Sequence, residues 1–191
     1  MTLRRATQED APFLALVVME ALGDDIMERA HADNANDGDR HRLELITDVI
    51  CRDDTLYSWR HALVAEDAGG TLLGAMVAYP GDGYVAMRDR TFSLLRELIT
   101  FDTASMDAET VPGEYYLDSL AVSPLARGKG VGRQLLCAAR DEAFAQSRPA
   151  ILACAPENTN AKALYETMGF REEGELFIFG HKYLRMVARA E

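Results

Sequence analysis

The order of elements in the C-terminal half constrains the fold of this chain most. Residues 115–122 are apolar on both faces of a strand, which is typical of a central strand buried between two layers. Pro124 ends this strand, a glycine-rich turn follows, and apolar residues four apart predict a helix over 131–146. A short buried strand at 150–155 precedes a second helix that Gly169 ends. This order predicts an α/β domain with at least one parallel or splayed strand pair.

The rest of the chain supplies further strands and helices to the same domain. Asp67-Ala68-Gly69-Gly70 lies between two β-rich segments and predicts a hairpin. The predicted strands outside the C-terminal segment are 3–7, 61–66, 71–79, 170–174 and 175–187. The predicted helices are 13–22, 43–50 and 85–101, with a polar loop or short helical turns at 23–42 and an exposed loop at 102–113.

Length and charge limit the kind of protein that this chain can be. A chain of 191 residues is long enough for one ordinary domain, so we expect residues 1–191 to form a single domain. Its net charge of -11 argues against a nucleic-acid partner. The longest apolar run, 13–19, is shorter than the ~20 residues of a membrane span and follows two acidic residues, which predicts neither a membrane segment nor a secretory signal. We therefore expect a cytoplasmic protein with three reduced cysteines.

Alternating glycines, Gly128, Gly130 and Gly132, stand where the central strand gives way to a helix. Unpaired backbone N–H groups and the positive end of the helix dipole favour an anion at such a position, and glycines let a phosphate approach the backbone. The spacing fits neither a Walker loop, which needs Ser or Thr after Lys129, nor a dinucleotide fingerprint. The alternative is a tight turn whose glycines serve packing alone.

Two motifs resemble those of a known family. Leu120-Ala121-Val122, Pro124 and Arg127-Gly128-Lys129-Gly130-Val131-Gly132 resemble the Q/R-x-x-G-x-G/A signature of the GNAT superfamily of N-acetyltransferases. Asn158-x-x-Ala161-x-x-Leu164-Tyr165-Glu166-x-x-Gly169-Phe170 is similar to the second motif of that superfamily. The resemblance implies a mixed, mostly antiparallel central sheet with a splayed parallel strand pair, flanked by helices. Residues 81–113 exceed the usual link between the third and fourth strands of that fold, so we expect an insertion there.

The resemblance also implies a co-substrate, acetyl-CoA, and roles for individual residues. Backbone groups of Leu120 and Val122 would pair with the pantetheine arm, and the Leu120 amide would donate to the thioester carbonyl. Asn158 would contact the pantetheine, and Tyr165 would protonate the departing thiolate; no metal is implied. The implied cofactor-binding residues are Leu120, Ala121, Val122, Arg127, Gly128, Lys129, Gly130, Val131, Gly132, Asn158 and Tyr165.

Attack by an amine also requires a base, because an alkylamine with a pKa of about 10.4 is protonated at neutral pH. Strand alternation would place Tyr116, Asp118, Leu120 and Val122 on one face. The resemblance implies that residues two and four positions before Leu120 face the acceptor, so Asp118, acting through a water, is the candidate base and Glu114 is the reserve. The alternative for Asp118 is a structural carboxylate bonded to the backbone or to Ser119. For Tyr165 the alternative is a core tyrosine.

The resulting functional hypothesis is transfer of an acetyl group from acetyl-CoA to a primary amine of a small molecule or peptide, by direct attack. The alternative is a non-catalytic acyl-CoA-binding or sensor module of the same fold. Acidic residues within 24–39 are compatible with a cationic acceptor, although a solvated acidic loop is the better explanation of them. A homodimer is an expectation from the fold alone.

Overall fold

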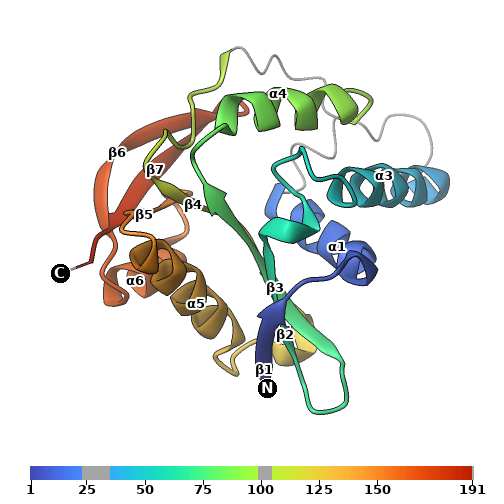
Figure 1. The fold of residues 1–191 in the computed structure, drawn as a ribbon, viewed down its shortest axis with the longest axis horizontal. Helices are drawn as coiled ribbons and strands as arrows, with labels where there is room; N and C mark the ends of the chain where they lie inside the picture. Colours follow the sequence, from blue (N-terminus) through green and yellow to red (C-terminus); the bar gives the residue numbers. More distant parts are fainter. Residues whose placement is uncertain (23–34, 99–104, 191) are drawn as a thin grey trace.

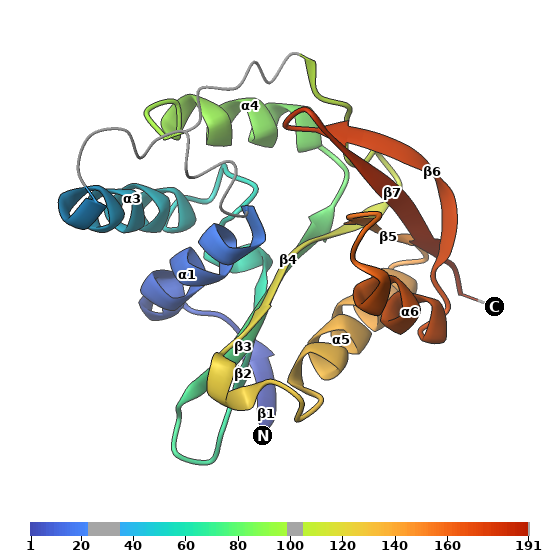
Figure 2. The same cartoon turned by 180° about the vertical axis from the view of Figure 1, so that it is seen from behind.

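The computed structural model describes residues 1–22, 35–98 and 105–190, and these form one sheet with helices on both faces (Figures 1 and 2). The seven strands lie in the order β1-β2-β3-β4-β5-β7-β6. Their bounds are Thr2–Arg5 (β1), Ala62–Glu66 (β2), Leu72–Pro80 (β3), Tyr115–Val122 (β4), Ala150–Cys154 (β5), Arg171–Ile178 (β6) and His181–Ala188 (β7). The helices are Ala11–Leu22 (α1), Ala35–Ile50 (α3), Tyr84–Leu94 (α4), Val131–Ala145 (α5) and Thr159–Thr167 (α6), with short 3-10 turns at Gln8–Asp10, Trp59–His61 and Pro124–Ala126.

All neighbouring strands are antiparallel except β4 and β5, which are parallel. These two pair at only two positions, Tyr115 with Ala150 and Tyr116 with Ile151. Beyond Tyr116 the strands β4 and β5 diverge. By contrast, β3 pairs with β4 from Tyr115 to Val122, with one irregularity. The mixed, mostly antiparallel sheet with one splayed parallel pair is confirmed.

Two apolar cores lie on opposite faces of the sheet. Helices α1 and α3 cover one face, and α5 with α6 covers the other (Figures 1 and 2). Helix α4 lies across one end, where the ring of its Phe92 meets Phe179 edge-on, with ring centroids 5.5 Å apart. The β2–β3 hairpin forms as predicted: Asp67 Oδ1 accepts hydrogen bonds from the amides of Gly69 at 2.8 Å and Thr71 at 2.9 Å, which closes the turn.

A β-bulge in β4 changes the predicted assignment of its side chains. Val77 pairs with Ser119 and Ala78 with Leu117, so Asp118 is an extra residue without a partner on β3. The bulge reverses the alternation of faces. The prediction that Leu120 and Val122 share a face with Tyr116 and Asp118 is wrong, because both side chains pack on the α5 side while Tyr116 lies in the opposite core.

The final strand pair also differs from the prediction. Its turn lies at Phe179 and Gly180, both with positive φ (51° and 79°), whereas the sequence predicted a break at 174/175. Gly174, with φ 127°, lies inside β6, where the pairing with β7 shifts between Glu172 and Glu175. The glycine therefore allows an irregularity within one strand and does not end it.

Three predicted helix and loop boundaries change as well. Helix α3 begins at Ala35, within the segment 23–42 that was predicted as a polar loop or short helical turns, and of which 23–34 lies outside the described residues. Helix α4 ends at Leu94, earlier than predicted, and residues 99–101 lie outside the described part. The described part of the predicted exposed loop 102–113, residues 105–113, contains buried Met106 and Thr110, so this part packs against the body of the protein. None of the described helices is both long and apolar enough to cross a membrane.

Candidate functional site

The glycines between β4 and α5 have two different structural causes. Gly128 (φ 73°) and Gly130 (φ 79°) adopt left-handed conformations, and a Cβ at either position would meet no atom within 4 Å. Their surroundings are therefore open, and the turn requires glycine for its backbone geometry. A Cβ at Gly132 would lie 3.3 Å from Val122 Cγ2, so this glycine allows α5 to pack closely on β4. Packing alone thus explains Gly132 but not the other two.

Helix α5 offers free backbone donors beside this open space. Its first internal backbone hydrogen bond runs from the amide of Gln134 to the carbonyl of Gly130 at 3.1 Å. The amides of Val131, Gly132 and Arg133 therefore have no acceptor within the helix, as in the first turn of any α-helix. Together with the helix dipole, these donors favour an anion at the turn.

The two cations of the turn differ in their contacts. Lys129 is exposed. Arg127 donates to Glu20 on α1 at 2.6 Å and to the carbonyl of Val122 at 3.2 Å. Arg127 is therefore already paired, and Lys129 is the freer of the two positive charges.

The splayed pair leaves one edge of β4 without a strand partner beside the glycine turn. From Leu117 onward β5 no longer pairs with β4. The Ser123 amide bonds the Leu73 carbonyl at 2.9 Å, so in the alternating antiparallel ladder Leu120 and Val122 stand at non-hydrogen-bonded positions opposite β3, and their backbone groups face the open edge. An extended chain can add to such an edge through main-chain hydrogen bonds. This edge lies between the glycine turn and the bulge at Asp118.

The second motif places Asn158 and Tyr165 on α6, which follows β5. Asn158 caps this helix, its Oδ1 accepting from the Ala161 amide at 3.1 Å. Tyr165 is half-buried, and the centroid of its ring lies 6.1 Å from that of Phe170. Burial and, as a smaller cause, the electrostatic effect of nearby Cys154 raise the pKa of Tyr165 to about 12. The hydroxyl is therefore a neutral weak acid, and within the described part of the chain it makes no hydrogen bond.

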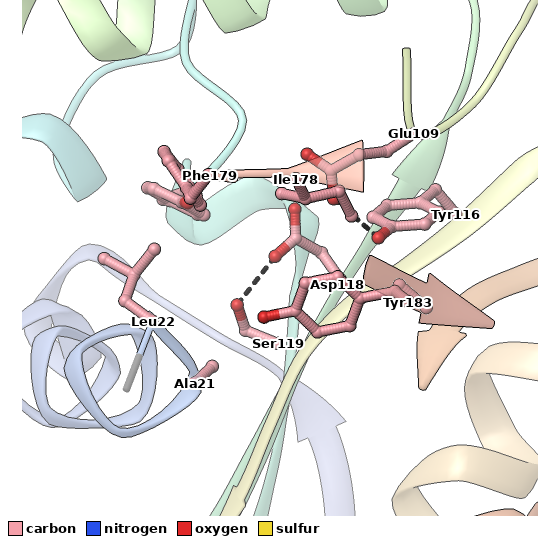
Figure 3. A pocket seen from close by; sticks show the side chains of 11 residues that line it. Ala21, Leu22, Glu109, Tyr116, Asp118, Ser119, Ile178, Phe179 and Tyr183 are labelled. Atoms are coloured by element: carbon pink, nitrogen blue, oxygen red, sulfur yellow. Dashed lines mark hydrogen bonds between the residues drawn. The ribbon is translucent and has the colours of Figure 1, made fainter. Parts of the chain in front are cut away.

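A cavity of about 110 Å³ opens on the α1 side of the sheet, where β4 and β5 diverge (Figure 3). Asp118 and Ser119 both face it, because the bulge turns these consecutive residues to the same side. We call this cavity the carboxylate pocket. Its lining residues are Ala21, Leu22, Tyr57, Glu109, Tyr116, Asp118, Ser119, Ala153, Ile178, Phe179 and Tyr183.

Two carboxylates in the pocket accept hydrogen bonds from neutral hydroxyl groups. Asp118 accepts from Tyr79 at 2.5 Å and from Ser119 at 2.7 Å. Glu109, which the sequence did not single out, accepts from Tyr84 at 3.0 Å and from Tyr116 at 2.6 Å. Four hydroxyls thus fix two acidic groups at the end of β4.

Burial sets the charge state of these groups. Burial raises the pKa of Asp118 above its ordinary value. Burial and, as a smaller cause, repulsion from Asp118 raise the pKa of Glu109 to about 7. Hydrogen bonds from tyrosines oppose both shifts. Burial raises the pKa of Tyr79 and of Tyr116 well above 10, so both phenols stay neutral donors. The pocket therefore gains negative charge as the pH rises through neutrality.

The structure places the predicted site residues in three groups. Asp118 lies in the pocket, Leu120 and Val122 follow it on the open edge of β4, and residues 127–132 form the anion turn. Glu114, the reserve base, is absent from the pocket lining and is tied to Arg185 and to the hydroxyl of Thr110. The described residues contain no group of three His, Cys, Asp or Glu side chains that could hold a metal ion.

Comparison with known proteins assigns the family. The profile described as "Acetyltransferase (GNAT) family" matches residues 26–170, about three quarters of the chain. The chain belongs to this family. The resemblance drawn from the two sequence motifs is thereby confirmed.

Relatives and solved structures agree with the GNAT assignment. N-alpha-acetyltransferase RimI of Mycobacterium tuberculosis is 32% identical over 98 residues, which cover 51% of this chain and 58% of RimI. An uncharacterised protein of Mycobacterium leprae, ML0378, is 43% identical over 65 residues, 34% of this chain and 18% of ML0378. The chain therefore spans less than two thirds of either curated relative.

Solved structures match over the whole chain. A crystal structure titled "acetyltransferase" has a TM-score of 0.79 at 26% identity and covers all of both chains. An N-acetyltransferase from Staphylococcus aureus Mu50 has a TM-score of 0.80 at 21% identity and covers 98% of this chain and 100% of its own. The latter, at its lower identity, supports the fold alone.

Proposed function

We propose that this GNAT protein is an N-acyltransferase that moves an acetyl group from acetyl-CoA to a primary amine of a small molecule or peptide by direct attack. One observation carries the proposal: the free edge of β4 joins an anion turn at one end to a carboxylate pocket at the other. An acyl donor with a diphosphate and an extended arm can span these sites, and an amine can enter the pocket. The name of the relative RimI, N-alpha-acetyltransferase, describes acetyl transfer to an amine and supports this proposal.

The turn and the strand edge would hold the donor. Amides of residues 131–133, the open backbone at Gly128 and Gly130, and the exposed Lys129 fit a diphosphate in charge and in space. Backbone groups of Leu120 and Val122 would pair with the pantetheine arm, and the Leu120 amide would donate to the thioester oxygen, where negative charge develops. Asn158 would keep its capping bond and contact the arm through its remaining polar atoms.

Two residues would move protons in this mechanism. Asp118 would accept the proton that the acceptor amine must lose, since its raised pKa makes it a stronger base than an ordinary aspartate. Tyr165, neutral at physiological pH, would give its proton to the departing thiolate. Acetyl-CoA supplies the activated acyl group.

Calorimetric titration with acetyl-CoA, followed by measurement of thiol release over a panel of primary amines, tests this function. Binding together with amine-dependent thiol release is the expected result. Tight binding without release on any amine would identify a sensor module, and no binding at all would contradict the proposed donor site.

A further inference from the structure

Glu109 reaches the carboxylate pocket from the long link between β3 and β4. Tyr84 on α4 donates to its Oε1 at 3.0 Å, and Tyr116 on β4 donates to its Oε2 at 2.6 Å. One bond comes from the link itself and the other from the central strand. The side chain is therefore held in place from both sides, beside Asp118 (Figure 3).

Among the described residues, the acidic groups that line the pocket have no cationic neighbour in its wall. No Lys, Arg or His occurs among the described residues that line it, and all four hydrogen bonds to Glu109 and Asp118 come from neutral hydroxyls. Arg88, on the second turn of α4, favours the charged form of Glu109 but makes no ion pair with it, bonding Asp89 instead. Two carboxylates that share a small, half-enclosed space repel each other, so a bound cation would stabilise both.

The remaining walls suit an organic cation. Tyr57, Tyr116, Phe179 and Tyr183 give the pocket aromatic walls, and Leu22 and Ile178 add aliphatic surface. Aromatic faces attract an ammonium group, and aliphatic surface favours the carbon atoms attached to it. If the same small molecule also carried a carboxylate next to the nitrogen, that group would be repelled by Glu109 and Asp118.

Building on the proposed acetyl transfer, we infer that Glu109 and Asp118 together bind the ammonium group of the acceptor. Glu109 is then a specificity-determining residue that selects cationic primary amines with no carboxylate next to the nitrogen. Alkylamines and amino-acid amides are substrates of this site, whereas the parent amino acids are poor ones.

Ammonium binding at this site depends on the protonation of Glu109. The ionisable groups around Glu109 are Asp118 and Tyr116 on β4, Tyr84 and Arg88 on α4, Tyr79 on β3 and Tyr57. With its pKa raised to about 7 by burial and by Asp118, Glu109 becomes neutral as the pH falls through that value. The kcat/KM for an alkylamine therefore declines below about pH 7, well separated from the amine's own pKa of about 10.4.

Glycinamide and glycine form a matched test pair, because they have nearly the same shape and differ by one negative charge. The wild-type protein, assayed by thiol release from acetyl-CoA, favours glycinamide. Glu109→Gln lowers kcat/KM for glycinamide by roughly tenfold to a hundredfold and narrows the preference over glycine. Glu109→Asp keeps part of the kcat/KM for glycinamide and part of the preference over glycine. Glu44→Gln, at an exposed ion pair on α3, changes neither the kcat/KM nor the preference.

A second variant reports on the charge of Glu109 without removing it. The hydrogen bond from Tyr116 lowers the pKa of Glu109, so Tyr116→Phe shifts the low-pH decline of kcat/KM to higher pH. A purely structural effect would change the height of this profile and leave its position unchanged. This shift also decides the inference if Glu109→Gln fails to fold.

The outcomes separate this inference from the proposed function. Unchanged selectivity in Glu109→Gln, or an unmoved pH profile in Tyr116→Phe, would overturn the inference while acetyl transfer stands. If no amine yields thiol, acetyl transfer fails, and ligand-observed NMR with glycinamide at pH 8 tests ammonium binding alone. Binding that is lost in Glu109→Gln supports the inference, and absence of wild-type binding overturns it.

Discussion

At the scale of single residues, four neutral hydroxyls and two carboxylates determine the character of the pocket. Tyr79 and Ser119 orient Asp118, and Tyr84 and Tyr116 orient Glu109. The hydrogen bonds of Asp118 fit a structural carboxylate as well as a catalytic base. Its bond to Ser119 is the contact that a structural role would require. Only measurements that depend on ionisation or turnover distinguish the two roles.

Tyr165→Phe tests the proposed acid. We expect kcat to fall by roughly a hundredfold with acetyl-CoA affinity nearly unchanged, because the hydroxyl acts only when the thiolate departs. Stopped-assay kinetics and calorimetry measure the two effects. Tyr115→Phe, which removes a long 3.4 Å bond to the carbonyl of Ala78 away from the pocket, is the control. Unchanged turnover in Tyr165→Phe would remove this residue from the mechanism and leave it as a core tyrosine.

The pKa of Glu109 also predicts how stability depends on pH. The folded pKa of about 7 lies above the ordinary 4.5, so between these values the unfolded chain releases a proton that the folded chain retains. The free energy of unfolding should therefore fall as the pH rises from about 4.5 to about 7, by on the order of 2 kcal/mol from this group. Glu109→Gln should flatten this slope in denaturant titrations at several pH values. An equal slope in wild type and variant would mean that Glu109 titrates normally.

At the scale of elements, two local departures from regular structure create the site. The bulge at Asp118 turns two consecutive β4 side chains toward the pocket and moves Leu120 and Val122 to the α5 side. The left-handed glycines at 128 and 130 then leave the beginning of α5 open. The glycine turn and the carboxylate pocket thus lie at opposite ends of the open edge of β4.

The charge of the anion turn can be tested at Gly130. Gly130→Asp and Gly130→Asn have nearly the same shape, and both residues tolerate positive φ better than most. We expect CoA to bind the Asp variant roughly tenfold more weakly than the Asn variant, because a carboxylate would stand beside the diphosphate. Calorimetry at low and high salt measures the difference, which should shrink at high salt. Equal affinities would show that the diphosphate binds elsewhere.

At the scale of the whole molecule, the link between β3 and β4 completes the carboxylate pocket beside the sheet. The segment 81–113, predicted as an insertion, contributes Tyr84 from α4 and Glu109 from the loop before β4. A single domain over 1–191 and a homodimer stay predictions. The carboxylate pocket is therefore built partly from the segment in which the sequence predicted an insertion.

The sequence predicted the parts of this molecule that depend on local patterns. The apolar strand 115–122, the glycine turn and the helix that Gly169 ends carry local signals, and all three form as expected. The bulge could not be predicted, because it depends on how β4 registers against β3, far away in the chain. Glu109 was missed because its loop composition indicates exposure, while its burial comes from contacts with α4 and β4.

A structure determined with CoA bound tests the central claim most directly. We predict that the diphosphate contacts the amides of residues 128–133, and that the pantetheine arm pairs with β4 at Leu120 and Val122, with its thiol directed toward the carboxylate pocket. A diphosphate bound away from this turn, or an arm that does not follow the open edge of β4, would contradict the account.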